Sequence, residues 1–103
     1  MFDPATYREA FSREHGVTEA EWARLLPGAA APHMLHLDAA GRRAEVHLGD
    51  GRLRLCWVPQ APRRIALLAL PRLAVDYRFE AVDGVSRVAF LRRFDAVMQR
   101  GGG

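Results

Sequence analysis

The stretch HMLHLDAAGRRAEVHLGDGRLRLCW, which occupies residues 33–57, constrains the fold more than any other part of the chain. Its apolar and polar residues alternate with a period of two, which is typical of β-strands that bury one face. Two turn signals interrupt the alternation, the sequence DAAGRR and the dipeptide Asp50-Gly51. The dipeptide favours a two-residue hairpin turn. We therefore predict three antiparallel strands at about 33–38, 43–48 and 53–58.

The predicted register gives these strands two different faces. A loop at 39–42 pairs Asp38 with Arg43, and a turn at residues 50–51 pairs Val46 with Leu55. One face then carries the apolar side chains of Leu35, Leu37, Ala44, Val46, Leu48, Leu53, Leu55 and Trp57. The opposite face carries Met34, His36, Asp38, Arg43, Glu45, His47, Arg54 and Cys56. A shift of one residue would mix the two sets, so the alternation indicates which side chains share a face.

Helix signals precede this region. Asp3, followed by a proline, predicts the start of a first helix, which would end at Gly16. Thr18 and Glu21 have the spacing of a capping box and predict a second helix. A Pro-Gly pair at 27–28 would end that second helix.

Two more strands and a helix are predicted after the third strand. The sequence VPQAPRR at 58–64 is typical of a loop. Residues 65–70 form an apolar strand, and residues 73–80 alternate as a half-buried strand should. An amphipathic helix follows over about 85–99. Its apolar side consists of Phe90, Leu91, Phe94, Val97 and Met98.

These elements predict a single α+β domain over residues 1–103. It consists of a helical hairpin formed by two N-terminal helices at 1–28, a five-stranded antiparallel β-meander at 33–80 and a C-terminal amphipathic helix at 84–100. Because apolar faces pack together, we expect the C-terminal helix to cover one sheet face.

The composition excludes several kinds of chemistry. All 15 basic residues are arginine, so the chain has neither a Schiff-base lysine nor a phosphate-loop lysine. Its two serines lie outside any Gly-x-Ser-x-Gly elbow, and the chain contains no cofactor-binding motif. With no convergent catalytic set, we expect a protein that is not an enzyme and needs no cofactor.

The single cysteine, Cys56, cannot form an internal disulfide. The N-terminus lacks the pattern of a signal peptide, and the longest apolar run, IALLAL, is far shorter than a membrane span. We therefore expect a soluble cytoplasmic protein with no membrane partner. The abundance of arginine and alanine in place of lysine and asparagine suggests a bacterial source.

One cross-strand row is a candidate metal site. The predicted register places His36, Glu45 and Cys56 side by side, with Cβ atoms about 5 Å apart. These residue types are ligands for zinc and similar metals. The alternative is an ordinary polar sheet face that also includes His47 and Arg54, and the positive charge of Arg54 opposes a bound cation.

The basic residues form a second candidate site. Residues 1–40 carry six acids and three arginines (6 − 3, net −3), whereas residues 41–103 carry six acids and twelve arginines (12 − 6, net +6). The residues proposed to bind a partner or nucleic acid are Arg63, Arg64, Arg92, Arg93 and Arg100. The alternative is that the acidic N-terminal part docks on the basic remainder.

The segment EHGVTEAEWARLL has the layout of a DNA-reading helix pair, with a glycine turn between two predicted helices. However, Glu19 and Glu21 would repel phosphates at the start of the reading helix, and ordinary capping chemistry explains the same residues. We therefore expect a small interaction module that binds another protein or itself, and pairing between the terminal strands of the meander in two copies would give a homodimer. Nucleic-acid binding and a metal or small-ligand site are the alternatives.

Overall fold

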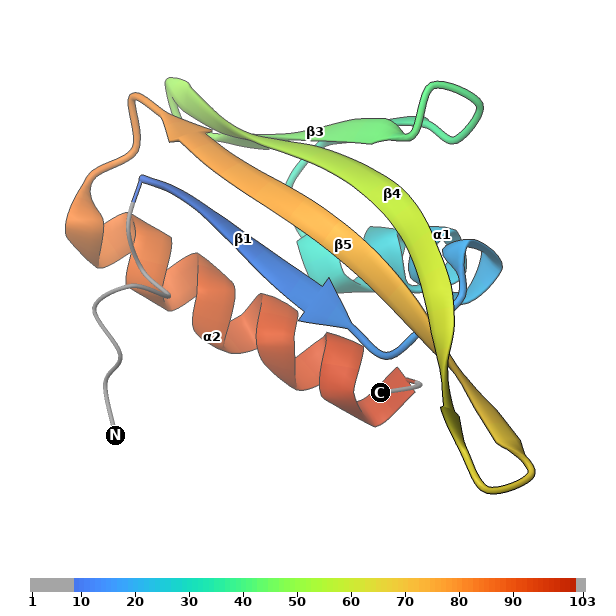
Figure 1. Cartoon of the computed structure of the whole chain (residues 1–103). Coiled ribbons are helices and arrows are strands. Elements are labelled where there is room, and N and C mark those ends of the chain that lie inside the picture. The colour runs from blue at the N-terminus through green and yellow to red at the C-terminus, as the bar shows by residue number, and fades with distance from the viewer. Residues whose placement is uncertain (1–8, 102–103) are drawn as a thin grey trace.

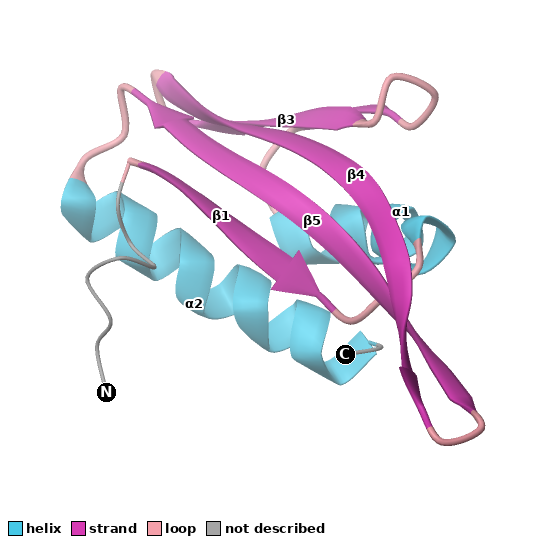
Figure 2. Cartoon of the chain, in the orientation of Figure 1, coloured by secondary structure: helices cyan, strands magenta, loops and turns pink. Residues whose placement is uncertain are grey.

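The computed structural model of the chain describes residues 9–101 and contains five strands and two helices within them (Figures 1 and 2). In chain order the elements are β1 (Ala10–His15), α1 (Glu19–Ala30), β2 (Leu35–Asp38), β3 (Arg43–Leu48), β4 (Gly51–Ile65), β5 (Leu68–Glu80) and α2 (Gly84–Gly101). The expected α+β class with an antiparallel sheet is confirmed, although the expected arrangement of elements is not. Within residues 9–101, neither helix is long and apolar enough to cross a membrane.

All five strands belong to one antiparallel sheet in the order β1-β5-β4-β3-β2. β1 and β2 are therefore the two edge strands, and α1, which lies between them in the sequence, crosses from one edge of the sheet to the other. Both helices lie on the same side of the sheet (Figure 1). The sheet consequently has one covered face and one open face.

The predicted N-terminal helical hairpin is wrong. The described part of the expected first helix is β1, which pairs with β5, and the predicted cap at Asp3 lies outside the described residues. Along β1, Phe11, Arg13 and His15 are partly buried while the residues between them are exposed. This period of two is typical of a strand, and β1 pairs along the edge of β5. The pairing satisfies backbone N–H and C=O groups of β5 that would have no partner if residues 10–15 formed a helix. Because residues 10–15 form a strand, the segment before the glycine turn is not the helix that the DNA-reading helix pair requires.

The predicted meander of five strands at 33–80 is also wrong. Residues 33–80 contain four strands rather than five. β4 continues through the expected loop at 58–64, and β5 combines most of the expected separate strands at 65–70 and 73–80 into one strand. The prolines in this region are tolerated because β4 and β5 extend beyond β3 and β1 there, which leaves their outer edges unpaired. The fifth strand of the sheet is β1.

The predicted start of α1 is confirmed, but its predicted end is wrong. The Thr18 Oγ1 atom accepts a hydrogen bond of 3.1 Å from the backbone N–H of Glu21. The helix then continues through Pro27 to Ala30. Its last turn buries Ala29 and Ala30 in the core, which offsets the backbone hydrogen bond that the proline removes.

The β2–β3 register is confirmed, with Asp38 opposite Arg43. The β3–β4 register differs from the prediction by two residues, since Val46 pairs with Leu53 and the turn consists of Gly49 and Asp50. A shift of two residues keeps every side chain on its predicted face but changes its cross-strand neighbour. The apolar face is accordingly turned toward the helices, while the polar face is open.

Gly51 explains why the turn signal was misleading. It lies at the start of β4 rather than in the turn, and a Cβ atom there would collide with the carbonyl oxygens of Glu80 and Ala81. The residue that needs a positive φ is Gly49, with φ of 62°. Glycine at position 51 is therefore required by close packing against the end of β5.

The core lies between the covered sheet face and the two helices, and Trp22 of α1 is at its centre. The Trp22 ring is 5.8 Å from the ring of Trp57 on β4 and 6.0 Å from the ring of Phe94 on α2. On α2 the predicted apolar side is confirmed: Phe90, Leu91, Phe94 and Met98 are buried, and Val97 packs against them.

We predict that Gly51→Ala destabilises the protein by about 1–3 kcal/mol, because the added methyl group has no room beside two backbone carbonyls. Gly16→Ala is the matched control, since no atom lies within 4 Å of the methyl group it adds. Urea unfolding of the two variants measures the difference. Equal stability of the two variants would contradict the close packing of Gly51 against the end of β5.

Candidate functional site

The most exposed apolar surface of the described residues is the outer part of the β4–β5 hairpin, which we call the arm and define as residues 58–72. The arm extends away from the rest of the sheet, at the end opposite to the start of α2 (Figure 1). Every residue from 58 to 70 is exposed, and Leu67 at the tip has a relative exposure of 103%. The large exposed aliphatic side chains on the arm are Val58, Ile65, Leu67, Leu68 and Leu70.

The arm is a continuous antiparallel hairpin. Ile65 pairs with Leu68, so the tip is a two-residue turn of Ala66 and Leu67, and Ala66 has a positive φ of 54°. A register irregularity between Gln60 and Arg63 interrupts the ladder near the base. Irregularities of this kind increase the local twist of a strand pair. The arm therefore has a defined backbone even though its side chains contact solvent.

The charges on the arm are all positive. It carries three arginines and no acidic residue, and two of the arginines pair with Glu14 of the neighbouring strand β1. Arg72 lies 2.9 Å from a Glu14 carboxylate oxygen, whereas Arg63 lies 3.8 Å from the other. The Arg72 hydrogen bond lowers the pKa of the Glu14 carboxyl below its ordinary value. Arg64, two residues from the tip turn, forms no ion pair with any described residue.

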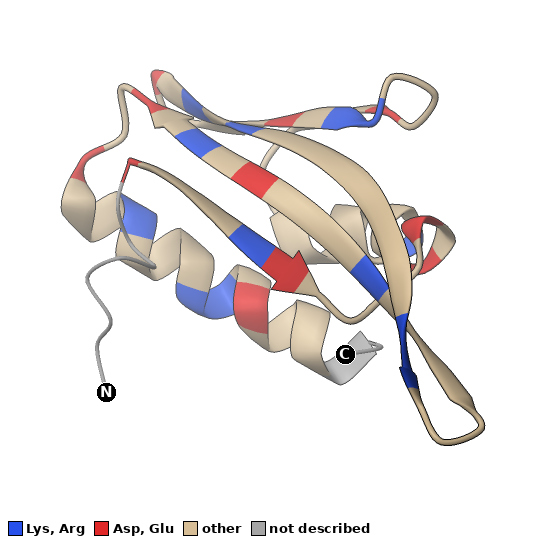
Figure 3. Cartoon of the chain, in the orientation of Figure 1, with Lys and Arg blue, Asp and Glu red and all other residues tan. Residues whose placement is uncertain are grey.

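The predicted basic residues do not form one surface. Arg63 and Arg64 lie on the arm, while Arg92 and Arg93 lie exposed on α2. The side chain of Arg100 is outside the described part of the structure. Along the strands and helices, basic and acidic residues are interspersed (Figure 3). The structure thus separates the predicted set into at least two sites.

The open sheet face carries a network of ion pairs. Glu80 accepts hydrogen bonds from Arg52 at 2.7 Å and from Arg54 at 3.5 Å, and Arg52 also reaches Glu45 at 3.2 Å. The hydrogen bond from Arg52 lowers the pKa of Glu80 below its ordinary value. Because these pairs are exposed to water, each contributes little to stability.

The predicted metal-ligand row is not brought together. His36 does face Glu45, but Glu45 faces Arg54 on its other side rather than Cys56. Cys56 is exposed and lies between Arg43 and an aspartate on β5. Among residues 9–101, no three His, Cys, Asp or Glu side chains are grouped so that they could hold a metal ion. The two-residue difference in the β3–β4 register separates the row.

The polar face instead places two histidines together. The rings of His36 and His47 are 5.0 Å apart, and His47 Nε2 is 3.7 Å from a Glu45 carboxylate oxygen. The sequence had placed these histidines in neighbouring rows. The confirmed β2–β3 register makes them diagonal neighbours, because His36 lies opposite Glu45 and His47 is two residues further along β3.

A partly buried polar cluster between β1, β5 and α2 was missed in the sequence. Arg13 donates a 2.6 Å hydrogen bond to Asp95, and its guanidinium lies 5.1 Å from the ring centre of Tyr77. The Tyr77 hydroxyl is 2.7 Å from Nε2 of His15. Burial, the largest single effect, lowers the pKa of Arg13, but the hydrogen bond and the charge attraction to Asp95, together with the contact with Tyr77, outweigh it and the pKa is raised. The cluster attaches β1 to the sheet and to α2.

Burial also determines the protonation states in this cluster. It lowers the pKa of His15 to about 4, with a further contribution from the nearby Arg13 charge, and it raises the pKa of Tyr77. His15 is therefore neutral at pH 7, and the protonated Tyr77 hydroxyl can donate to it. No signal could have identified the cluster while residues 10–15 were predicted as a helix, because it depends on the β1–β5 pairing.

No protein-family model matches the chain, and no curated protein matches it. The function must therefore be inferred from the geometry of these sites.

We predict that His15 makes the stability depend on pH. Its pKa is lower in the folded chain than in the unfolded one, so the unfolded chain binds a proton more readily as the pH falls below about 6.5. Between pH 7 and pH 5 the free energy of unfolding should fall by about 1–2 kcal/mol for this reason. Urea unfolding at both pH values measures the change.

In His15→Gln this contribution should be absent, since glutamine does not titrate and can still bond to the Tyr77 hydroxyl. His36→Gln, which changes an exposed histidine, should keep the full change. If His15→Gln and the unaltered protein lost the same stability over this pH range, the buried neutral His15 would be contradicted.

Proposed function

We propose that this protein is an interaction module that docks its arm into an apolar, acid-rimmed groove of another protein. The observation that supports this most directly is the surface of the arm, where thirteen consecutive residues, 58–70, are exposed and five of them are large aliphatics. A monomeric protein rarely leaves so large a group of apolar side chains in water unless the group binds something.

The prolines of the arm favour a partner that binds its side chains over one that pairs with its backbone as an added strand. Pro59, Pro62 and Pro71 have no backbone N–H, so they interrupt the donor row along the free edges of the hairpin. A partner strand added to either edge would lose hydrogen bonds at these positions. This argues against the pairing of two copies through arm strands and favours insertion of the leucine-rich tip into a groove.

The charges of the arm support an acidic rim on the partner. Arg63 and Arg64 lie next to the tip, and Arg64 has no counter-charge among the described residues. Charge complementarity would attract an acidic partner surface and orient the tip before it inserts. The arm has no aromatic side chain on which bases could stack, so it offers less to a single-stranded nucleic acid.

A cytoplasmic location and a bacterial source are part of the same proposal. The single cysteine and the exclusive use of arginine as the basic residue support them.

We predict that the double variant Leu67→Ser/Leu68→Ser loses the partner. Central apolar side chains of a docking element contribute about 2 kcal/mol or more when truncated, which corresponds to about 30-fold or more in affinity. Quantitative mass spectrometry compares the cellular proteins that are retained by tagged forms of the unaltered protein and of the variant. The partner identified in this way is then purified and titrated against each form. Because both leucines are exposed, the melting temperature should not fall.

Val85→Ser is the matched control, since Val85 has a relative exposure of 82% but lies on the first turn of α2, away from the arm. A partner kept by the unaltered protein and by Val85→Ser, but lost by the double variant, supports the proposal. Retention of every partner by the double variant would contradict it. A dimer that depends on Leu67 and Leu68 would assign the arm to a second copy instead, and release of the partner by nuclease would assign it to nucleic acid.

A further inference from the structure

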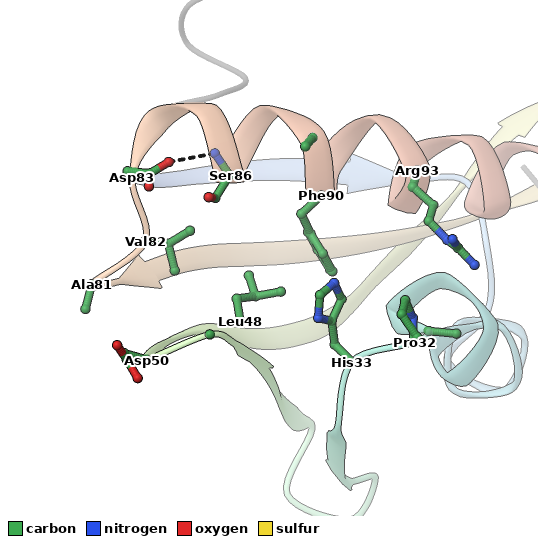
Figure 4. A pocket seen from close by; sticks show the side chains of 13 residues that line it. Pro32, His33, Leu48, Asp50, Ala81, Val82, Asp83, Ser86, Phe90 and Arg93 are labelled. Carbon is green, nitrogen blue, oxygen red and sulfur yellow. Dashed lines mark hydrogen bonds between the residues drawn. The ribbon is translucent and has the colours of Figure 1, made fainter.

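A pocket of about 560 Å³ lies at the other end of the molecule from the arm. It is formed where the first half of α2 meets the β3–β4 turn and the segment that leads into β2 (Figure 4). Small-molecule sites in proteins commonly have volumes of this size. None of its lining residues belongs to the arm, so a ligand bound in this pocket would act independently of the proposed docking function.

The pocket has an apolar middle. Leu48 comes from β3, and the buried side chains of Val82 and Phe90 come from the loop before α2 and from α2 itself. The ring of Phe90 lies 5.8 Å from the ring of His33. A ligand with a hydrocarbon or aromatic body could therefore bury it against aliphatic and aromatic surface.

The two ends of the pocket differ in charge. Figure 4 places Asp50 and Asp83 toward one end and His33 and Arg93 toward the other. One Asp83 carboxylate oxygen accepts a 2.8 Å hydrogen bond from the backbone N–H of Ser86. Arg93 forms no ion pair with any described residue, so its five N–H donors are available to an anion. At the other end the guanidinium of Arg87, which donates to the Val82 carbonyl, offsets part of the Asp83 charge, whereas Asp50 forms no ion pair with any described residue. The charges therefore favour one negative group at the Arg93 end and oppose a second one near Asp50.

We infer that this pocket binds a small monocarboxylate with an apolar body. The carboxylate pairs with the guanidinium of Arg93 and accepts a hydrogen bond from the ring N–H of His33, and the body lies on Leu48 and Phe90. An arginine fork matches a carboxylate with two parallel hydrogen bonds, which gives such a pair both strength and orientation. The acidic end selects against dicarboxylates through like-charge repulsion.

The test uses phenylbutyrate as the probe, with its uncharged amide and with phenylsuccinate, a dicarboxylate, for comparison. Backbone amide chemical shifts of the isotopically labelled full chain are followed during titration. We expect saturable shifts at Leu48, Val82 and Phe90 with phenylbutyrate, and binding of the amide and of phenylsuccinate that is at least about tenfold weaker.

The decisive variant is Arg93→Gln, which should weaken phenylbutyrate binding about tenfold or more without lowering the melting temperature. Arg92→Gln is the matched control, because Arg92 is exposed on the same helix but does not line the pocket. Asp50→Asn should leave binding of phenylbutyrate unchanged or strengthen it.

Three results would overturn the inference. They are the absence of saturable shifts at about 10 mM probe, equal binding of phenylbutyrate and its amide, and equal binding by Arg93→Gln and Arg92→Gln. Because the arm takes no part in the measurement, a failure here leaves the proposed docking function intact, and loss of partner binding through the arm leaves this pocket intact.

Discussion

The packing of Trp22 in the middle of the core holds the rest of the structure together. This one side chain on α1 contacts the ring of His15 on β1 at 5.0 Å, the ring of Trp57 on β4 at 5.8 Å and the ring of Phe94 on α2 at 6.0 Å. Buried aromatic side chains provide the largest apolar area per residue, and their edge-to-face contacts add to it. The two helices and the sheet thus all meet at this side chain.

This packing determines how the chain is routed. α1 must lie across the covered face of the sheet to bury Trp22, and its two ends then deliver the chain to opposite edges, β1 on one side and β2 on the other. β1 is held at its edge by the Arg13–Asp95 pair and by the contact between His15 and Tyr77. The helices leave the opposite face to a layer of exposed ion pairs, such as those of Glu80 with Arg52 and Arg54.

The same routing explains why an arm exists. β4 has 15 residues and β5 has 13, whereas β1 and β3 have only six each. At about 3.3 Å per residue, the central hairpin is roughly 50 Å long, while its neighbours are roughly 20 Å long. The outer part of the hairpin therefore extends beyond the helices that could cover it. Its aliphatic side chains have no core to enter, and this is the physical basis for proposing that a partner covers them.

The sequence predicted the features that depend on local pattern. The alternation identified which side of Val46 and Leu53 is buried, the capping chemistry placed the start of α1 at Thr18, and the helical period identified Phe94 on the buried side of α2. These features need only neighbouring residues and a preference for burying apolar surface.

The features that depend on contacts between distant segments were not predictable. Residues 10–15 carry helix signals, but an open edge of β5 overrides them. Gly51 resembles a turn glycine, although it is needed because Glu80 and Ala81 approach it from the end of another strand. That two-residue difference moved Cys56 away from Glu45 and removed the predicted ligand row. Residues 58–64 of the arm were predicted to form a loop because prolines usually exclude strands, and only the unpaired edges of the hairpin make them tolerable.

The core around Trp22 stabilises the body of the protein, and the arm lies outside that core. This division is tested most directly by replacing residues 61–71 with an Asn-Gly turn that joins the paired residues Gln60 and Arg72, and by measuring the free energy of unfolding. We expect a cooperative transition with a change smaller than about 1 kcal/mol, because the removed residues bury little surface. A loss of more than about 3 kcal/mol, or of the cooperative transition itself, would show that the arm is part of the folded core and would contradict this division of the molecule.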